Sequence, residues 1–294
     1  MKLQNYALGE WIECREKGQE LYDATTGKSM GFADTSGLKF DDILRYAREV
    51  GNPALRKMTF HQRGRCLKQL ALYLLERKNK YYEVSYATGA TKTDGWIDIE
   101  GGIGNLFVYA SKGRREFPDK SFCVDGRPEI LSKDGGFIGH HIYVPKEGVA
   151  VHINAFNFPV WGMLEKIAVN LLAGVPAVVK PATATSFLTE EVFKDIIESQ
   201  ILPEGSLQLI CGSASGILDH VTSQDVVTFT GSASTGKKLR AHPRIQELSV
   251  PFNLEADSLN CSILGPDATP ETEEFKIFIK EVAREMTVKA GQKC

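Results

Sequence analysis

Apolar residues recur with two different periods along the chain, and the change falls near residue 148. Between residues 38 and 88 the period is helical. Residues 41–48 carry acidic side chains first and arginines later, as a helix dipole favours, and leucines recur through residues 63–80. Thr59 precedes this second helical run. The first part of the chain therefore predicts a set of helices.

From residue 148 onward, short apolar runs alternate with helical patterns. The predicted strands are 149–153, 177–180, 207–211, 226–230 and 250–254. The predicted helices are 161–174, 186–201, 213–222, 233–241 and a last run over about 271–290. Alternation at this period predicts an α/β fold with a doubly wound parallel sheet, in which ligands bind beyond the carboxyl ends of the strands.

Two segments do not follow either pattern. Glycines, prolines and alternating apolar residues over 120–147 predict a β-ribbon that projects from the body. The glycine-rich residues 101–104 follow no strand signal, so close packing between helices is favoured there over a phosphate site.

Composition narrows the classes of function. The 294 residues carry a net charge of −2, so there is no basic surface for nucleic acid or an anionic membrane. The start of the chain lacks the apolar region of a secretory signal, and no apolar run approaches the roughly 18 residues of a membrane helix. The six cysteines match no zinc or disulfide spacing, so we expect no metal and a reducing, cytoplasmic compartment.

Three residues offer the chemistry of covalent aldehyde oxidation. Cys294 is a thiol nucleophile once its pKa falls. Glu255 ends an apolar run, so we expect it to be partly buried, and a partly buried carboxylate has a raised pKa and can act as a general base. Asn157, between two phenylalanines and ahead of a proline, can donate to a developing oxyanion. Taken singly, each has a plainer interpretation: an inert cysteine, an exposed acid at a strand end, and an asparagine turn.

Two further motifs suit a nucleotide. Lys180 ends a predicted strand, where it can reach a ribose hydroxyl or a phosphate. Residues 229–238 read as strand, small-residue turn and helix start, where backbone N–H groups can bind a pyrophosphate. The same run matches the phosphate loop of NTPases up to Lys237, but Lys238 stands where Mg²⁺ needs a hydroxyl ligand.

The combined motifs resemble the aldehyde dehydrogenase superfamily. They occur in the family's order and at nearly its spacing: Asn157-Phe158-Pro159, Lys180-Pro181-Ala182, Phe229-Thr230-Gly231-Ser232, Glu255 and Gly291-Gln292-Lys293-Cys294. A closer likeness, carried by residues 109–111, 151–166 and 255–260, is to the branch that oxidises coenzyme A-linked semialdehydes in aromatic acid degradation, including the dehydrogenase half of the bifunctional ring-opening enzyme of phenylacetate degradation.

The resemblance implies a Rossmann-like cofactor domain over residues 1–258 and the start of a catalytic domain over 259–294. It implies catalytic roles for Cys294, Asn157 and Glu255. It also implies a set of cofactor-binding residues: Ile153, Phe156, Lys180, Thr183, Gly212, Gly231, Ser232 and Gly236. Because family members continue well past the nucleophile, we expect the 294 residues alone to be inactive, and the full-length parent to be a homo-oligomer that uses the ribbon as its arm.

Two residues, Thr183 and Glu255, indicate which cofactor is used and which product is released. NAD-preferring members commonly carry an acid after Lys-Pro-Ala, whereas Thr183 brings no charge to repel a 2′-phosphate, so we expect NADP, with NAD as the alternative. Glu255 favours a free acid as product. The usual Glu-Leu-Gly-Gly is replaced by residues 255–258, Glu-Ala-Asp-Ser, which lack both glycines. Two other functions stay open: a nucleotide-binding module without chemistry, and a P-loop NTPase.

Overall fold

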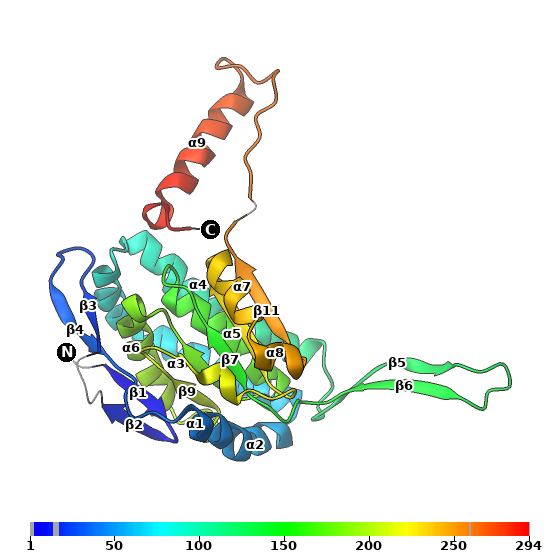
Figure 1. The fold of residues 1–294 in the computed structure, drawn as a ribbon. Helices are drawn as coiled ribbons and strands as arrows, with labels where there is room; N and C mark the ends of the chain where they lie inside the picture. Colours follow the sequence, from blue (N-terminus) through cyan, green and yellow to red (C-terminus); the bar gives the residue numbers. More distant parts are fainter. Residues whose placement is uncertain (1–2, 14–17, 259, 294) are drawn as a thin grey trace.

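A seven-stranded sheet forms the centre of the computed structural model, which describes residues 3–13, 18–258 and 260–293 (Figure 1). In order across the sheet the strands are β11 (Phe252–Ala256), β10 (Val226–Gly231), β7 (Ala150–Ile153), β8 (Ala177–Lys180), β9 (Leu207–Leu209), β1 (Gln4–Ala7) and β2 (Glu10–Glu13). The first five are parallel, and β1 and β2 add an antiparallel edge. The predicted fold class and its five parallel strands are confirmed.

The helices, in chain order, are α1 (Phe40–Tyr46), the π-helix η1 (Ala47–Gly51), α2 (Asn52–Lys57), α3 (Phe60–Ser85), η2 (Tyr86–Thr88), α4 (Lys92–Arg115), α5 (Pro159–Ala173), η3 (Thr183–Thr185), α6 (Ser186–Glu198), η4 (Ile217–His220), α7 (Ala233–Arg240), α8 (Pro243–Glu247), α9 (Glu273–Thr287) and η5 (Val288–Gly291). The Thr59 hydroxyl accepts the Gln62 N–H and caps α3, and Thr91 caps α4 in the same way.

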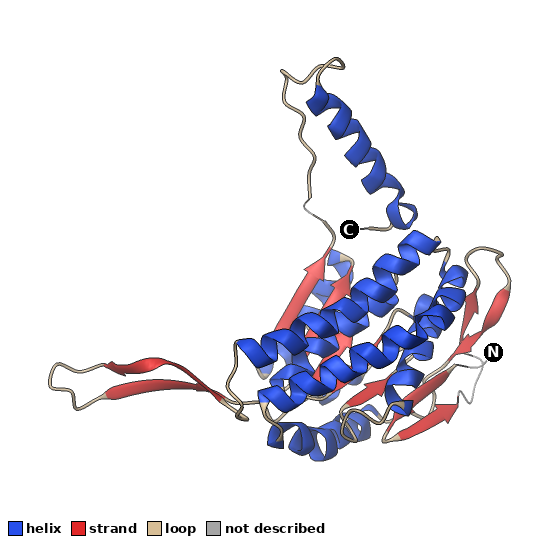
Figure 2. Ribbon diagram, turned by 180° about the vertical axis from the view of Figure 1, so that it is seen from behind, coloured by secondary structure: helices blue, strands red, loops and turns tan. Residues whose placement is uncertain are grey.

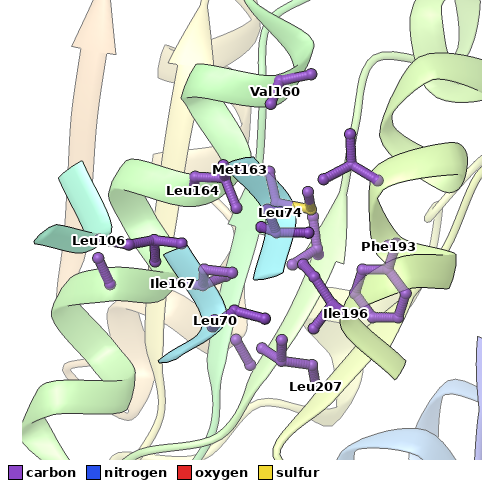
Figure 3. Packing of buried hydrophobic residues seen from close by; sticks show 14 of the residues in the cluster. Leu70, Leu74, Leu106, Val160, Met163, Leu164, Ile167, Phe193, Ile196 and Leu207 are labelled. Atoms are coloured by element: carbon purple, nitrogen blue, oxygen red, sulfur yellow. The ribbon is translucent and has the colours of Figure 1, made fainter. Parts of the chain in front are cut away.

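Alternating side chains of the parallel strands enter two hydrophobic cores, one on each face of the sheet. Val149 and Val151 pack toward α1 and α8, whereas Ala150 points to the opposite face. On that opposite face lie the long helices α3, α4, α5 and α6, as Figure 2 shows from behind. Figure 3 shows their core side chains gathered together, with Leu70 and Leu74 of α3 beside Met163 and Ile167 of α5, and with Phe193 and Ile196 of α6 close by.

Two antiparallel hairpins stand outside the sheet. β3 (Gln19–Tyr22) pairs with β4 (Ser29–Ala33), and β5 (Cys123–Ile130) pairs with β6 (Ile138–Tyr143). The second hairpin projects from the body, which confirms the ribbon predicted over 120–147 (Figure 1). Its strands expose apolar side chains such as Ile130, Ile138 and Ile142.

Two predicted helices differ from the structure. The prediction over 213–222 is wrong: only the short 3₁₀-helix η4 forms, because serines and Gly216, with a φ of +92°, leave the helical conformation before it. The predicted run 271–290 is α9 followed by η5, where Lys289 takes a φ of +54°. α9 stands apart from the sheet, and none of its residues is buried (Figure 1).

Candidate active site

The predicted site residues gather at one edge of the sheet. Because β11, β10, β7, β8 and β9 are parallel, their carboxyl ends meet at the same edge, the one turned toward α9 and the C-terminus (Figure 1). Glu255 and Gly231 lie at the ends of β11 and β10, and Ile153 and Lys180 at the ends of β7 and β8. Gly212 follows β9.

Asn157 lies in the loop between β7 and α5, half-buried, and contacts the tail of the chain. Its Nδ2 donates a hydrogen bond of 2.6 Å to the backbone oxygen of Gln292. Cys294 itself is outside the described residues, but Gln292 and Lys293 are not. The segment that precedes the thiol therefore lies against the amide that the sequence assigns to the oxyanion.

Glu255 lies beside Thr230 on the neighbouring strand, and the Thr230 hydroxyl donates to Glu255 Oε2 at 3.4 Å. Its side chain is exposed in this chain, whereas the sequence argument for a base rested on partial burial. A polar neighbour and access to solvent leave the carboxylate free to contact a water molecule.

A cavity of about 300 Å³ brings these side chains together. Asn157 and Glu255 both line it, from β7–α5 and from β11, and Lys293 closes it from the tail. The remaining lining residues come mainly from α5 and the loop before it: Ile97, Ala155, Phe158, Trp161, Gly162, Glu165, Lys166, Thr230 and Asn260. Trp161 Nε1 donates to Glu165 Oε2 at 2.7 Å, and Lys166 pairs with Glu165 at 2.8 Å.

Lys180 and Thr183 lie together beyond β8. The Lys180 ammonium donates to the Pro181 carbonyl at 2.8 Å and to the Thr183 hydroxyl at 3.2 Å. Burial lowers the pKa of Lys180. Phe156, expected beside the cofactor, is 49% exposed at the same edge, on the loop after Ile153.

The turn from β10 to α7 presents backbone N–H groups at the start of a helix. Ser232 is the N-cap, and its hydroxyl accepts the N–H of Thr235 at 3.4 Å. The Ala233 N–H donates to Asp257 Oδ1 at 3.1 Å, so the acid that replaces a family glycine caps this turn. A negative group already lies where a pyrophosphate is expected.

At two of the glycines predicted to bind the cofactor, close packing leaves little room for a side chain. A Cβ on Gly236 would lie 2.3 Å from Leu254 Cδ1, and one on Gly212 would lie 3.0 Å from Thr35 Cγ2. α7 starts at Ala233, so the residues between Gly231 and Gly236 form a helical turn. The open loop that cradles phosphate in P-loop NTPases is missing here, which argues against that alternative.

Sequence reasoning missed two acidic residues of α4 that contact the segments around the cavity, Asp94 and Asp98. Asp98 of α4 accepts the N–H groups that start α5, and Asp94 accepts the backbone N–H of Lys289 at 2.9 Å. The sequence feature that could have revealed them is their spacing: two acids four positions apart, on one face of a helix, in a run of small and apolar residues. It was missed because no helix was predicted over residues 92–115.

Within the described ranges, no group of three or more His, Cys, Asp and Glu side chains is arranged to bind a metal ion. Among the same residues, none of the helices combines the length and apolar character that crossing a membrane requires.

Comparison with known sequences identifies a family. The model described as "Aldehyde dehydrogenase family" matches residues 11–294. The 3,4-dehydroadipyl-CoA semialdehyde dehydrogenase of Aromatoleum evansii is 44% identical over 100% of the chain and 57% of its own length. The α-ketoglutaric semialdehyde dehydrogenase of Bacillus subtilis is 26% identical over 99% of the chain and 57% of its length. The chain thus spans a little over half the length of these curated relatives.

Solved structures share the fold. An aldehyde dehydrogenase from Bacillus cereus in complex with NAD⁺ superposes with a TM-score of 0.81 at 21% identity, over 100% of this chain and 58% of that one. An NADP-dependent glyceraldehyde-3-phosphate dehydrogenase from Bacillus halodurans, complexed with NADP, gives 0.80 at 22% identity, over 100% of this chain and 60% of that one.

Proposed function

Since the chain belongs to the aldehyde dehydrogenase family, we propose that it is part of an NADP-dependent enzyme that oxidises an aldehyde to a carboxylic acid. Residues 1–258 form the cofactor domain in this proposal, and 259–294 begin the catalytic domain. The observation that carries it is the shared cavity, where Asn157, Glu255 and the residue before Cys294 meet.

The covalent step uses the thiol and the amide. The Cys294 thiolate attacks the aldehyde carbon, a C–S bond forms, and the carbonyl electron pair moves to oxygen. Asn157 Nδ2 has a second N–H beyond the one it donates to Gln292, and that N–H stabilises the oxyanion together with the backbone N–H of Cys294. The expected placement of these donors rests on the family resemblance and on the contact between Asn157 and the tail.

The residues at the sheet edge fit a dinucleotide. The ammonium of Lys180 with the hydroxyl of Thr183 suits a ribose that carries a 2′-phosphate. At the start of α7 the Asp257 carboxylate accepts the Ala233 N–H, so a pyrophosphate would bind this turn only after displacing Asp257. When bound, the nicotinamide supplies the acceptor for the hydride that leaves the substrate carbon. Neither Thr183 nor its hydrogen-bond partner Lys180 brings a negative charge to repel NADP.

Hydrolysis uses Glu255. Its carboxylate takes a proton from water, and the hydroxide adds to the thioester carbon. The tetrahedral adduct then collapses and expels the Cys294 thiolate, which leaves the acid as product. The exposure of Glu255 and its place on the cavity wall support this role.

The substrate we propose is a coenzyme A-linked semialdehyde from aromatic acid degradation. The relative at 44% identity is named for such a substrate. The segments that carry the resemblance to this branch, 151–166 and 255–260, include Asn157 and Glu255. The proposal includes a reducing, cytoplasmic setting, in which the thiol stays available. It also includes a homo-oligomer, since the ribbon exposes apolar side chains along both strands.

The test is an assay of the longest reading frame that contains this chain. We expect aldehyde-dependent formation of NADPH, lost in Cys294→Ser, and accumulation of a protein-bound thioester in Glu255→Gln, detected by mass spectrometry of the Cys294 peptide. Cofactor binding without turnover of any semialdehyde would favour a nucleotide-binding module instead.

A further inference from the structure

We propose that Asp94, Asp98 and Lys289 are positioning residues for the covalent step, because they fix the nucleophile segment and the oxyanion amide against one helix, α4. The inference rests on the proposed function. It adds residues that do not touch the reacting atoms and that act through Asn157 and through the segment before Cys294.

Asp98 fixes the start of α5. It is 1% exposed, and its Oδ1 accepts the N–H of Trp161 at 2.8 Å and of Val160 at 3.2 Å. Phe158, the N-cap of α5, supplies no side-chain cap, so the carboxylate of another helix replaces it. Burial raises the pKa of Asp98 to about 6. Since Asn157 lies directly before Phe158, the position of its amide depends on this contact.

Asp94 fixes the tail. Its Oδ2 completes the capping box of α4 with Thr91, and its Oδ1 is left to accept the backbone N–H of Lys289 at 2.9 Å. The two residues are 195 positions apart in the chain. One carboxylate therefore joins the first turn of α4 to the segment five residues before the thiol.

Lys289 has an unusual environment for a lysine. It is 8% exposed, and its ammonium lies 5.1 Å from the centre of the Phe158 ring. Burial lowers its pKa, while the charges of Asp98 and Asp94 oppose that change. Lys289 and Ala290 both have a φ of +54°, a left-handed conformation that non-glycine residues adopt only when their contacts require it. Such a turn aims the following residues toward the cavity.

These contacts connect α4, the start of α5 and the tail of the chain to one another. Asp94 and Asp98 lie one turn apart on the same face of α4, one bound to the tail and the other to α5. Asn157 of the loop before α5 then binds Gln292 of the tail at 2.6 Å. Loss of the contact between Asp98 and α5, or of the contact between Asp94 and the tail, would separate the Asn157 amide from the segment before Cys294. Misplacement of reacting groups by about 1 Å can slow a reaction by roughly 100-fold.

The experiment uses the full-length protein and the variants Lys289→Met and Asp94→Asn. Methionine keeps the apolar contact with Phe158 and removes the charge. We expect kcat to fall roughly 10- to 100-fold, because the thiol and the amide would be misplaced, with the dissociation constant of NADP unchanged within about twofold. We expect the rate of Cys294 alkylation by iodoacetamide, followed on its own peptide by mass spectrometry, to fall by a similar factor. Lys280→Met, the same change on the exposed surface of α9, is the matched control.

The outcomes separate the two proposals. If the unchanged protein oxidises no semialdehyde, the proposed function fails, while the alkylation rates still report on positioning. If the unchanged protein is active and both variants keep kcat and alkylation within twofold, the positioning role is overturned. Should Lys289→Met fail to fold by circular dichroism, Asp94→Asn decides by the same criteria, because it keeps the size of the side chain and removes the negative charge that acts on Lys289.

Discussion

At the scale of single residues, we propose that the choice between NADP and NAD depends on position 183. The Thr183 hydroxyl lies 3.2 Å from the Lys180 ammonium, so a carboxylate placed there would pair with the lysine and repel a 2′-phosphate. We expect Thr183→Glu to weaken NADP binding roughly 10-fold or more relative to NAD, as the loss of a charged contact predicts. Fluorescence titration of both cofactors measures the ratio. Thr269→Glu, on an exposed loop, is the control, and an unchanged ratio in Thr183→Glu would refute the NADP assignment.

His152 gives the chain a pH-dependent stability. It is 3% exposed, its Nδ1 lies 2.8 Å from the Thr228 hydroxyl, and its Nε2 lies 2.9 Å from Asn170 Oδ1. Burial lowers its pKa to about 4, and the charge of Lys166 acts in the same direction. Between about pH 6.5 and 4 the unfolded chain binds a proton that the folded chain does not, so stability falls as the pH falls through this window, by about 3 kcal/mol in total.

We therefore expect His152→Gln to lose less free energy of unfolding between pH 7 and about pH 4.5 than the unchanged chain does, by about 2–3 kcal/mol. Urea titrations at the two pH values measure it. His141→Gln on the exposed ribbon should keep the profile of the unchanged chain. Equal pH dependence in all three proteins would mean that His152 is not buried in its neutral form.

At the scale of elements, α4 and α5 cross closely at a glycine. A Cβ on Gly102 would lie 2.9 Å from Trp161 Cα and 3.0 Å from its backbone nitrogen, whereas a Cβ on Gly104 meets nothing within 4 Å. Gly102→Ala must therefore push the helices apart and should cost about 1–3 kcal/mol. Gly104→Ala should stabilise the helix by about 0.5–1 kcal/mol. Thermal unfolding of both variants measures the two changes in stability. If Gly102→Ala and Gly104→Ala change the stability by similar amounts, close helix packing is not the reason for the glycine at position 102.

The sequence predicted elements well where the apolar pattern was continuous. β7, β8 and β9 are buried strands in which eight of eleven residues are apolar, so their pattern is plain. β1 and β2 were not predicted because each mixes polar and apolar side chains and pairs at the antiparallel edge of the sheet. Glu255 was expected to be partly buried. The prediction failed because burial of the end of β11 depends on which segments cover the sheet edge.

At the scale of the whole molecule, cofactor binding and catalysis should separate in these 294 residues. Every predicted cofactor residue lies in the part built on the sheet with its two cores, whereas α9 buries none of its residues. In the isolated chain Cys294 also carries the terminal carboxylate, and a neighbouring negative charge disfavours a thiolate.

We therefore expect the isolated chain to bind NADP without oxidising aldehydes. At about 100 times its dissociation constant, NADP should stabilise the fold by roughly 2.7 kcal/mol, more than NAD does and far more than Mg-ATP. Lys180→Ala should reduce the thermal shift, because the ammonium beside Thr183 is lost. Sustained aldehyde-dependent NADPH formation by the isolated chain would show that the rest of the catalytic domain is dispensable. A cooperative melt that NADP leaves unmoved would mean that this part of the chain binds the cofactor only when the remaining residues cover the sheet edge.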